Sequence, residues 1–348
     1  MQGGTGDGPH YDVVVVGGGS AGLSGASTLG RARRSVLVVD SGEPRNAPAT
    51  GVHTYLGLEG VAPADLLAAG RDEVRRYGGA VRHGTVVTAE RHEHGGFRVV
   101  LADGGVVHGD RLLVTTGLTD VLPPVPGLRE LWGRDVLHCP YCHGWEVRDQ
   151  PIGVLSTGPL AVHQALLWRQ WSADVTLFRH TGPAPSDEEE EQLAARGITV
   201  VEGEVAALGT TGGRLSAVRL ADGSDVPCRA LAVAARLDAR AGFLAGLGLV
   251  PVGQEMAGHE IGGRIPSDPT GATSVPGVWV AGNVTTLTDQ VIAAAAAGVR
   301  AGAAVNADLV AEETRRAVAA RREAVSVFSA PSEREVCDRV LGDRRHGV

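Results

Sequence analysis

Two cysteines separated by two residues, Cys139 and Cys142, are the side chains in this sequence best suited to redox chemistry. Two thiols at this spacing can close a disulfide within one turn of the chain, and a neighbouring imidazole can take up or return a proton during thiol exchange. His138 and His143 flank the pair directly. The segment is therefore a candidate thiol–disulfide centre, and its function depends on a partner that exchanges electrons with it.

The same segment permits two other interpretations. Cys-x-x-Cys-His is also the attachment signature of c-type haem, but that attachment usually needs export, and residues 1–9 lack the features of a signal peptide. Two cysteines and two histidines could also hold zinc, but His138 and His143 adjoin the cysteines and are poorly placed to close a tetrahedron. We therefore predict no metal site and interpret His138 as a packing or hydrogen-bonding residue. Cys228 and Cys337 are isolated and are interpreted as core or surface fillers.

The first strongly patterned element is the β-branched run Val13 to Val16, which is typical of a buried parallel strand. Gly-x-Gly-x-x-Gly follows at once, then a helix of small residues and a strand at 35–39 that ends on an acid. Glycines at these positions permit a tight turn, the approach of backbone N–H groups to a pyrophosphate, and close packing of helix on strand, while the acid can accept hydrogen bonds from a ribose. The residues predicted to bind a dinucleotide are Gly17, Gly19, Ser20, Ala21, Gly22 and Asp40.

Composition limits the classes of function. The chain has 348 residues, 43% hydrophobic and 21% charged, which suits about two globular domains. A net charge of −8 and the lack of a basic run argue against a nucleic-acid surface. No stretch of roughly 18 or more apolar residues could span a membrane, so we expect a soluble, cytoplasmic protein. In a reducing compartment, cysteines are more often catalytic or buried than bridged.

Strands and helices continue to alternate along the chain. Hydrophobic strands run up to 111–115, where a proline-rich linker follows. A second strand–helix–strand unit is expected over 152–178. A third block, 250–310, contains a short strand, Gly282 and Asn283, and then a helix. This alternation predicts an α/β protein with two related Rossmann-like units.

These motifs resemble the low-molecular-weight thioredoxin reductase family of flavin-dependent disulfide oxidoreductases. The resemblance covers about residues 10–311. It depends on the N-terminal glycine pattern, on Thr115-Thr116-Gly117, on the cysteine pair between the two units, and on Gly282-Asn283.

The resemblance implies a particular division of the chain. Each domain would be a three-layer ββα unit. A FAD-binding domain would be formed by 10–118 and 250–311, and an NADPH-like domain at 119–249 would be inserted into it, with the cysteine pair at its start. The family also implies a homodimer, and a C-terminal helical extension at 312–348 could enlarge its interface.

The resemblance further implies roles for the cofactor motifs. FAD would be held by the first glycine turn and Asp40, and its remaining parts would lie along the later motifs. Asn283 stands where the family usually has Asp, and its amide still offers a hydrogen-bond acceptor. The residues implied for this part of the cofactor are Thr116, Gly117, Gly282, Asn283, Gln290 and Val291.

Roles within the cysteine pair follow from the same resemblance. Cys142 would lie against the flavin, and Cys139 would form the mixed disulfide with the substrate. The family usually has an Asp after the second cysteine, where this chain has His143. An imidazole with an ordinary pKa near 6.5 accepts a thiol proton at neutral pH far better than a carboxylate does. This substitution favours a base for thiol oxidation.

The expected NADPH site departs from the family pattern. In the second glycine turn, Ser156 replaces the first glycine, and Pro159 removes a backbone N–H at the start of the helix. After the strand at 174–178, where the family has an Arg-rich segment for the 2′-phosphate, only Arg179 precedes an acidic run at 187–191. The run is typical of a solvated helix N-terminus. We expect no tight binding of NADPH.

The departures favour a particular branch of the family. His143 and the degraded nucleotide motif resemble the dithiol oxidases of sulfur-containing natural-product pathways, such as those that close the disulfides of gliotoxin and holomycin. That branch implies a FAD-dependent dithiol oxidase for a small-molecule dithiol, with O2 as electron acceptor. Two alternatives stay open: a reductase of thioredoxin-like protein disulfides fed by NAD(P)H or another donor such as ferredoxin, and a flavin-bound redox sensor.

Overall fold

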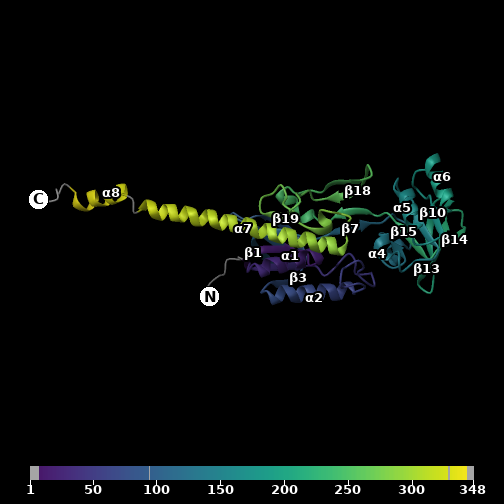
Figure 1. The fold of residues 1–348 in the computed structure, drawn as a ribbon, viewed down its shortest axis with the longest axis horizontal. Helices are drawn as coiled ribbons and strands as arrows, with labels where there is room; N and C mark the ends of the chain where they lie inside the picture. The colour runs from purple at the N-terminus through teal and green to yellow at the C-terminus, as the bar shows by residue number, and fades with distance from the viewer. Residues whose placement is uncertain (1–7, 94, 328–329, 343–348) are drawn as a thin grey trace.

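A computed structural model describes residues 8–93, 95–327 and 330–342. Two α/β lobes lie side by side, and the C-terminal helix projects well beyond the first of them (Figure 1). Each lobe has a sheet covered by helices on one face; the sheet is parallel in the second lobe, whereas in the first lobe the pairs β4–β5 and β5–β6 are antiparallel. The predicted α/β class, with two three-layer Rossmann-like units, is confirmed.

The first lobe is built on a seven-stranded sheet in the order β3-β2-β1-β6-β5-β4, with β19 paired to β6. Successive valines of β1 point to opposite faces, as a strand requires: Val13 and Val15 enter the core beneath the helices, and Val14 and Val16 the opposite core. Its strands are β1 (His10–Val16), β2 (Val36–Asp40), β3 (Ala80–His83), β4 (Val86–Arg91), β5 (Phe97–Leu101), β6 (Val106–Val114) and β19 (Val278–Val280).

Three helices cover one face of this sheet: α1 (Ser20–Arg31), α2 (Pro63–Arg76) and α7 (Val291–Val327). Helices α1 and α7 lie side by side in Figure 1. Glycines let their backbones meet, since a Cβ on Gly298 would overlap the Ala21 carbonyl and one on Gly302 would lie 2.8 Å from the Gly25 oxygen. This contact fixes the start of α1, and with it the first glycine turn, against the third block of the chain.

The second lobe has a parallel sheet in the order β11-β10-β9-β15-β8, with α5 (Ala161–Trp168) and α6 (Asp187–Ala195) on one side. An antiparallel sheet of β12, β13 and β14 packs on the other face. The strands of this lobe are β8 (Val136–Leu137), β9 (Ile152–Leu155), β10 (Val175–Phe178), β11 (Thr199–Val201), β12 (Val205–Thr211), β13 (Arg214–Leu220), β14 (Asp225–Pro227) and β15 (Ala230–Val233).

The chain crosses between the lobes twice, on β7 (Leu118–Val121) and β16 (Arg236–Ala239), which pair with each other antiparallel. They form a four-stranded sheet with β17 (Val252–Met256) and β18 (His259–Arg264). After β16 the chain packs on the first core through Ala241, Leu244 and Leu249. The return to the first lobe therefore begins before residue 249, because these apolar side chains find their partners there.

Short helices complete the fold: α3 (Leu128–Leu131), α4 (Pro140–His143), and the 3-10 turns η1 (Gly242–Leu247) and η2 (Gly282–Val284). The helix expected at the end of the third block is α7, which continues to Val327, and α8 (Ala330–Leu341) follows it. Residues 328–329 and 343–348 of the predicted extension lie outside the described residues.

Candidate active site

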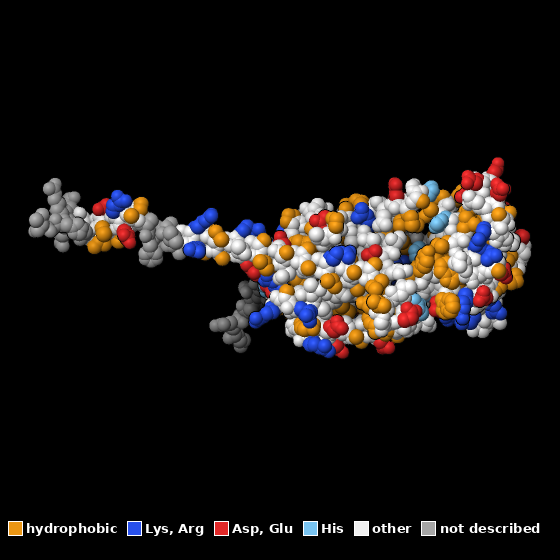
Figure 2. All heavy atoms as spheres, in the orientation of Figure 1, with side chains coloured by type: hydrophobic (Ala, Val, Ile, Leu, Met, Phe, Trp, Pro, Cys, Tyr) orange, Lys and Arg blue, Asp and Glu red, His pale blue; other side chains and the backbone are white. Residues whose placement is uncertain are grey.

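One cavity of about 910 Å³ opens between the lobes, along the first glycine turn, the cysteine helix α4 and the start of α7. Histidine atoms show at the hollow between the two lobes in Figure 2. Gly22 packs behind the cavity, between helix and strand. The other predicted site residues all line it: Gly17, Gly19, Ser20, Ala21, Asp40, Thr116, Gly117, Cys139, Cys142, His143, Gly282, Asn283, Gln290 and Val291.

The first glycine turn has the backbone that its sequence predicts. Gly17 has a φ of +107°, which L side chains rarely adopt, and a Cβ on Gly22 would overlap the Gly17 carbonyl. At Gly19 the situation is the reverse, because no atom lies within 4 Å of the position of a Cβ, and the backbone opens on the cavity. Asp40, at the end of β2, accepts a hydrogen bond from the Gly18 N–H at 3.0 Å, which ties the two strands together.

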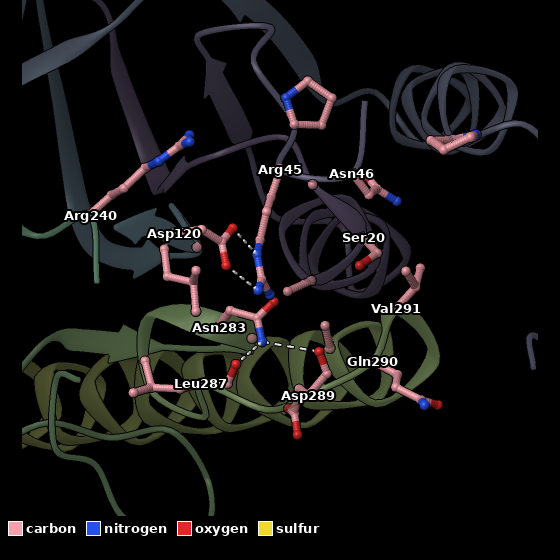
Figure 3. Close-up of a pocket in the computed structure, with 18 of the residues that line it drawn as sticks. Ser20, Arg45, Asn46, Asp120, Arg240, Asn283, Leu287, Asp289, Gln290 and Val291 are labelled. Carbon is pink, nitrogen blue, oxygen red and sulfur yellow. Dashed lines mark hydrogen bonds and ion pairs between the residues drawn. The ribbon is translucent and has the colours of Figure 1, made fainter. Parts of the chain in front are cut away.

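Asn283 organises the turn that leads into α7. Its Nδ2, which carries two hydrogens, lies within hydrogen-bond distance of three backbone carbonyl oxygens: those of Thr286 at 3.0 Å, Leu287 at 3.2 Å and Asp289 at 3.0 Å. Figure 3 shows two of these contacts. Sequence reasoning treated Asn283 as an acceptor equivalent to Asp, but an ionised carboxylate could not make these donations. The side chain therefore has a structural task that its amide group alone can perform.

Thr116 and Gly117 join the sheet to the crossing strands. The Thr116 hydroxyl donates to the Arg240 carbonyl at 2.6 Å, and the Arg240 N–H donates to the Gly117 carbonyl at 3.0 Å. Gly117 has a φ of +68° and has no atom within 4 Å of the position of a Cβ. Thr116 and Gly117, which line the cavity, are thus held between the two strands that cross between the lobes, β7 and β16.

The cysteine pair lies on α4, with Cys139 at the N-cap. The Cys142 thiol donates to the Cys139 sulfur, and the two Sγ atoms are 2.6 Å apart. This bond, aided by the backbone N–H groups of Cys142 and Tyr141 and by the Gln290 side chain, lowers the pKa of Cys139 to about 7 against the opposing effect of burial. The same bond and burial raise the pKa of Cys142. Cys139 is therefore the thiol that ionises first when the pair is reduced.

The two flanking histidines differ in their surroundings. His138 Nδ1 lies 3.3 Å from the Val233 carbonyl, as the hydrogen-bonding interpretation predicts. His143 lines the cavity beside the pair, and burial lowers its pKa below the ordinary value despite the opposing charge of Glu146. Its imidazole is neutral at neutral pH and can accept a proton.

Sequence reasoning missed an ion pair inside the cavity. Arg45, in the loop after β2, makes a two-pronged contact with Asp120 of β7: Nε donates to Oδ2 at 2.7 Å and Nη2 to Oδ1 at 2.6 Å. Figure 3 shows the Arg45 side chain entering the cavity beside Asp120. The two residues are 75 positions apart and belong to no local motif, so no pattern in the sequence links them.

A loop beside α4 was missed as well. Glu59 accepts from the Thr54 N–H at 2.9 Å and lies 2.6 Å from His53 Nδ1, whose other nitrogen lies 3.5 Å from Glu146. The Thr54 hydroxyl donates to Gln290 Oε1 at 3.0 Å. Thr54 has a φ of +58°, a rare backbone for a β-branched residue. This loop connects the first lobe to the segment that carries the cysteines.

Comparison with known proteins identifies the family. Residues 11–302 match the model of the pyridine nucleotide-disulphide oxidoreductase family. The chain belongs to this family. As the motifs predicted, its relatives include thioredoxin reductases: tcpT of Claviceps purpurea (strain 20.1) is 32% identical over 86% of this chain and 95% of its own length, and sirT of Leptosphaeria maculans is 30% identical over 85% and 93%. A probable thioredoxin reductase of Arthroderma benhamiae shares 41% identity over 157 residues, 38% of that protein.

Solved structures give the same result for this oxidoreductase. The crystal structure of HlmI superposes with a TM-score of 0.83 at 45% identity, over 91% of this chain and 98% of HlmI. An oxidoreductase from Agrobacterium tumefaciens superposes with a TM-score of 0.80 at 34% identity, over 86% and 99%. The expected resemblance to flavin-dependent thioredoxin reductases is confirmed, and FAD is the cofactor of this oxidoreductase.

The residues of this oxidoreductase fit such a cofactor. The cavity runs from the helix N-terminus at Gly19 to the cysteine pair, so it could take an extended molecule. The open backbone at Gly19 suits a pyrophosphate, which a helix N-terminus stabilises. Asp40 uses one oxygen on the Gly18 N–H, which leaves its carboxylate able to accept from a ribose.

The corresponding turn in the second lobe of this oxidoreductase is built differently. Ser156 is buried, and its Oγ occupies the space beside Gly182, whose N–H donates to the Ser156 carbonyl at 3.0 Å. Arg179, at the end of β10, is paired with Glu202 at 2.7 Å. The acidic run starts α6 with a Ser186–Glu189 capping box, as the helix interpretation predicts. Red atoms gather over α6 in Figure 2.

The described residues offer neither a cluster of metal ligands nor a membrane-spanning helix. No three His, Cys, Asp or Glu side chains there gather closely enough to hold a metal ion. No helix in the part of the chain that the structure describes is both long and apolar enough to cross a membrane.

Proposed function

We propose that this oxidoreductase is a FAD-dependent dithiol oxidase that forms a disulfide in a small-molecule dithiol and uses O2 as electron acceptor. The observation that carries the direction of the reaction is the ion pair of Arg179 with Glu202. It places a carboxylate beside the single Arg after β10 that could meet the 2′-phosphate of NADPH, while the first turn and the cysteine pair keep all their parts. Electrons are therefore better supplied by the thiols than by a nicotinamide.

The cofactor would be held by the first lobe. Backbone N–H groups at Gly19 to Ala21 would meet the pyrophosphate, and Asp40 the ribose. The remaining parts would lie along Thr116, Gly117, Gly282 and Asn283, with Gln290 and Val291 near the ring system, all of which line the same cavity. When bound, FAD would supply a two-electron acceptor for the Cys142 thiolate, and O2 would take up the electrons as hydrogen peroxide.

The thiol chemistry belongs to α4. In the resting enzyme Cys139 and Cys142 form a disulfide. A substrate thiolate attacks the Cys139 sulfur, and the electron pair of the broken bond remains on Cys142. The second substrate thiolate then attacks the substrate sulfur of the mixed disulfide, which releases the cyclic or linear disulfide and Cys139. The low pKa of Cys139 makes it a good leaving group in this second step.

Proton transfer falls to His143. Burial keeps its imidazole neutral, so it can remove a proton from a substrate thiol before each attack. One dithiol releases two protons and two electrons, and the same numbers convert one O2 to one hydrogen peroxide. His143 therefore has to pass each proton on to solvent before it can accept the next.

The assembly proposed with this function is a cytoplasmic homodimer. Helix α7 projects beyond the first lobe (Figure 1), and its exposed apolar side chains include Val310 and Val318. Light scattering during size-exclusion chromatography tests this: a mass of twice the 35.8 kDa chain supports it, and a monomeric mass contradicts it.

Anaerobic mixing tests the direction of electron flow. A small dithiol should bleach the flavin absorbance, and air should restore it with about one peroxide per disulfide formed. NADPH should bleach it slowly or not at all. Rapid bleaching by NADPH, with transfer of its electrons to a thioredoxin-like disulfide, would instead make the protein a reductase, the function that the relatives tcpT and sirT carry in their names.

A further inference from the structure

The Arg45–Asp120 ion pair has the geometry of a fixed positive group rather than of a surface contact. The Asp120 side chain is 6% exposed and that of Arg45 is 29% exposed. Asp120 holds the guanidinium by two of its five N–H groups, at 2.7 and 2.6 Å. A guanidinium held in this way loses little further freedom when it meets a third group.

The rest of that guanidinium is available to the cavity. Arg45 and Asp120 both line it, as do the cysteines of α4. No further hydrogen bond from Arg45 occurs among the described residues, so three N–H donors remain for another partner. Arg240, which lines the same cavity, differs: it donates to the Thr119 hydroxyl and to the Glu43 carbonyl, at 3.1 and 3.2 Å.

The thiol that needs such a group is Cys142. When a substrate thiolate opens the disulfide, the electron pair of the broken bond remains on the Cys142 sulfur, which is half-buried and next to a second sulfur. Burial and the neighbouring thiol both disfavour its thiolate, and the charge of Arg45 opposes them. A charge at a partly buried site acts more strongly than in water, because solvent screens it less.

We propose that Arg45, oriented by Asp120, is the positioned cation that stabilises the Cys142 thiolate as it leaves the disulfide. The inference rests on the proposed function only in taking Cys142 as the thiolate released toward the cofactor. A guanidinium suits this task better than a lysine, since it stays charged when partly buried and is fixed in direction by its carboxylate partner. Asp120 is the positioning residue, and it also moderates the charge of Arg45.

The stabilisation of the Cys142 thiolate by Arg45 can be measured directly through the reactivity of the Cys142 thiol. In a Cys139→Ser holoenzyme the effects of Cys139 are removed, and burial and Arg45 remain as the influences on Cys142. The rate of alkylation of Cys142 by iodoacetamide is followed against pH, with peptide mass spectrometry to separate it from Cys228 and Cys337. The midpoint of this profile reports the ionisation of Cys142.

Opposite shifts are expected for the two partners. Arg45→Met should raise the midpoint by about one pH unit, so that alkylation at a fixed lower pH slows about tenfold. Asp120→Asn should lower the midpoint, because it removes a negative charge and leaves Arg45. The double variant, which leaves no unpaired buried charge, should fall between them. Arg240→Met should leave the midpoint where it was.

The outcomes separate this inference from the proposed function. A purely structural ion pair would leave all midpoints unchanged, or move both single variants in the same direction, and either result overturns the role of Arg45. If only the double variant folds, its midpoint should lie above that of the Cys139→Ser parent, because Arg45 and not Asp120 acts on Cys142. A midpoint at or below that of the parent overturns the role of Arg45. A thiolate that lies against the flavin adds a long-wavelength absorbance to the spectrum. If the Cys139→Ser holoenzyme lacks this absorbance but the alkylation midpoints shift as expected, Cys142 does not lie on the flavin side, and the role of Arg45 is still supported.

Discussion

The two lobes contain the same strand–turn–helix unit, but the backbone of the turn opens on the cavity in the first lobe, whereas a side chain fills the turn in the second. After β1, Gly17 takes a φ of +107°, and the backbone at Gly19 opens on the cavity. After β9, the corresponding first position is Ser156, whose side chain is buried in its own loop. The fold needs only the strand and the helix, whereas a ligand needs the backbone groups between them.

The ends of the second strands repeat the contrast. Asp40 closes β2 with its carboxylate facing the cavity and a hydrogen bond from the first turn. Arg179, just after β10, points its charge into an ion pair with Glu202. The second lobe therefore has the architecture of a nucleotide domain, but the charge at the end of its second strand is paired with a carboxylate.

A valine at the open glycine position of each turn should give the largest difference between the lobes in its effect on FAD binding. Gly19→Val places a side chain where no protein atom lies within 4 Å, so the fold is spared, but the approach to a pyrophosphate is blocked. We expect FAD affinity to fall on the order of 100-fold or more. Gly158 has equally open space in the second turn, and Gly158→Val should change neither FAD content nor oxidase rate.

Flavin absorbance per protein after gel filtration measures this. If both valine variants lose FAD, the second turn supports the cofactor site indirectly. If neither does, the first turn does not hold the pyrophosphate.

Helix α4, which carries the cysteines, provides the next test. His143→Gln removes the base without changing the helix propensity greatly, and kcat/KM for a dithiol should fall roughly 100- to 1,000-fold at neutral pH. Because burial lowers the pKa of His143, the wild-type imidazole stays neutral to below pH 6.5, and activity is lost only as pH falls through that lowered pKa.

The pH profile of kcat/KM is the readout. In His143→Gln the acid limb should disappear, so the ratio to wild type narrows at low pH. An unchanged acid limb would assign it to another group.

Much of this contrast could be predicted from local sequence. Gly17, Gly22 and Asp40 lie on one strand–helix–strand unit, where spacing alone fixes their relation. Arg45 and Asp120 could not be paired in this way, because their contact depends on how β7 leaves the sheet. Asn283 was located but its donor role was not, since the three carbonyls it binds belong to a turn whose shape no pattern reveals.

Removal of the carboxylate that pairs with Arg179 should make the second lobe better able to bind a nucleotide phosphate, as the first lobe is. In Glu202→Ala the guanidinium is free to meet a phosphate, and flavin reduction by NADPH should quicken about tenfold. It should remain slow, because Pro159 still lacks an N–H. Glu260→Ala, which breaks a 2.7 Å pair with Arg236, is the matched control and should have no effect. An equal response from both variants would mean that net charge, and not Arg179, limits NADPH.

The smallest effect is expected at Asn283, where the first lobe departs from its own family. Asn283→Asp introduces the residue that the family resemblance implies, but it replaces the two N–H donors of the amide by a carboxylate that faces three carbonyl oxygens. We expect a loss of about 1–2 kcal/mol, seen as a several-fold weaker affinity for FAD and a melting temperature lower by a few degrees. Asn306→Asp is the matched control on α7: Asn306 Oδ1 accepts from Arg34 at 2.8 Å, which a carboxylate also can do. If Asn283→Asp binds FAD as tightly as wild type, the turn does not depend on the amide, and the two residues are interchangeable there.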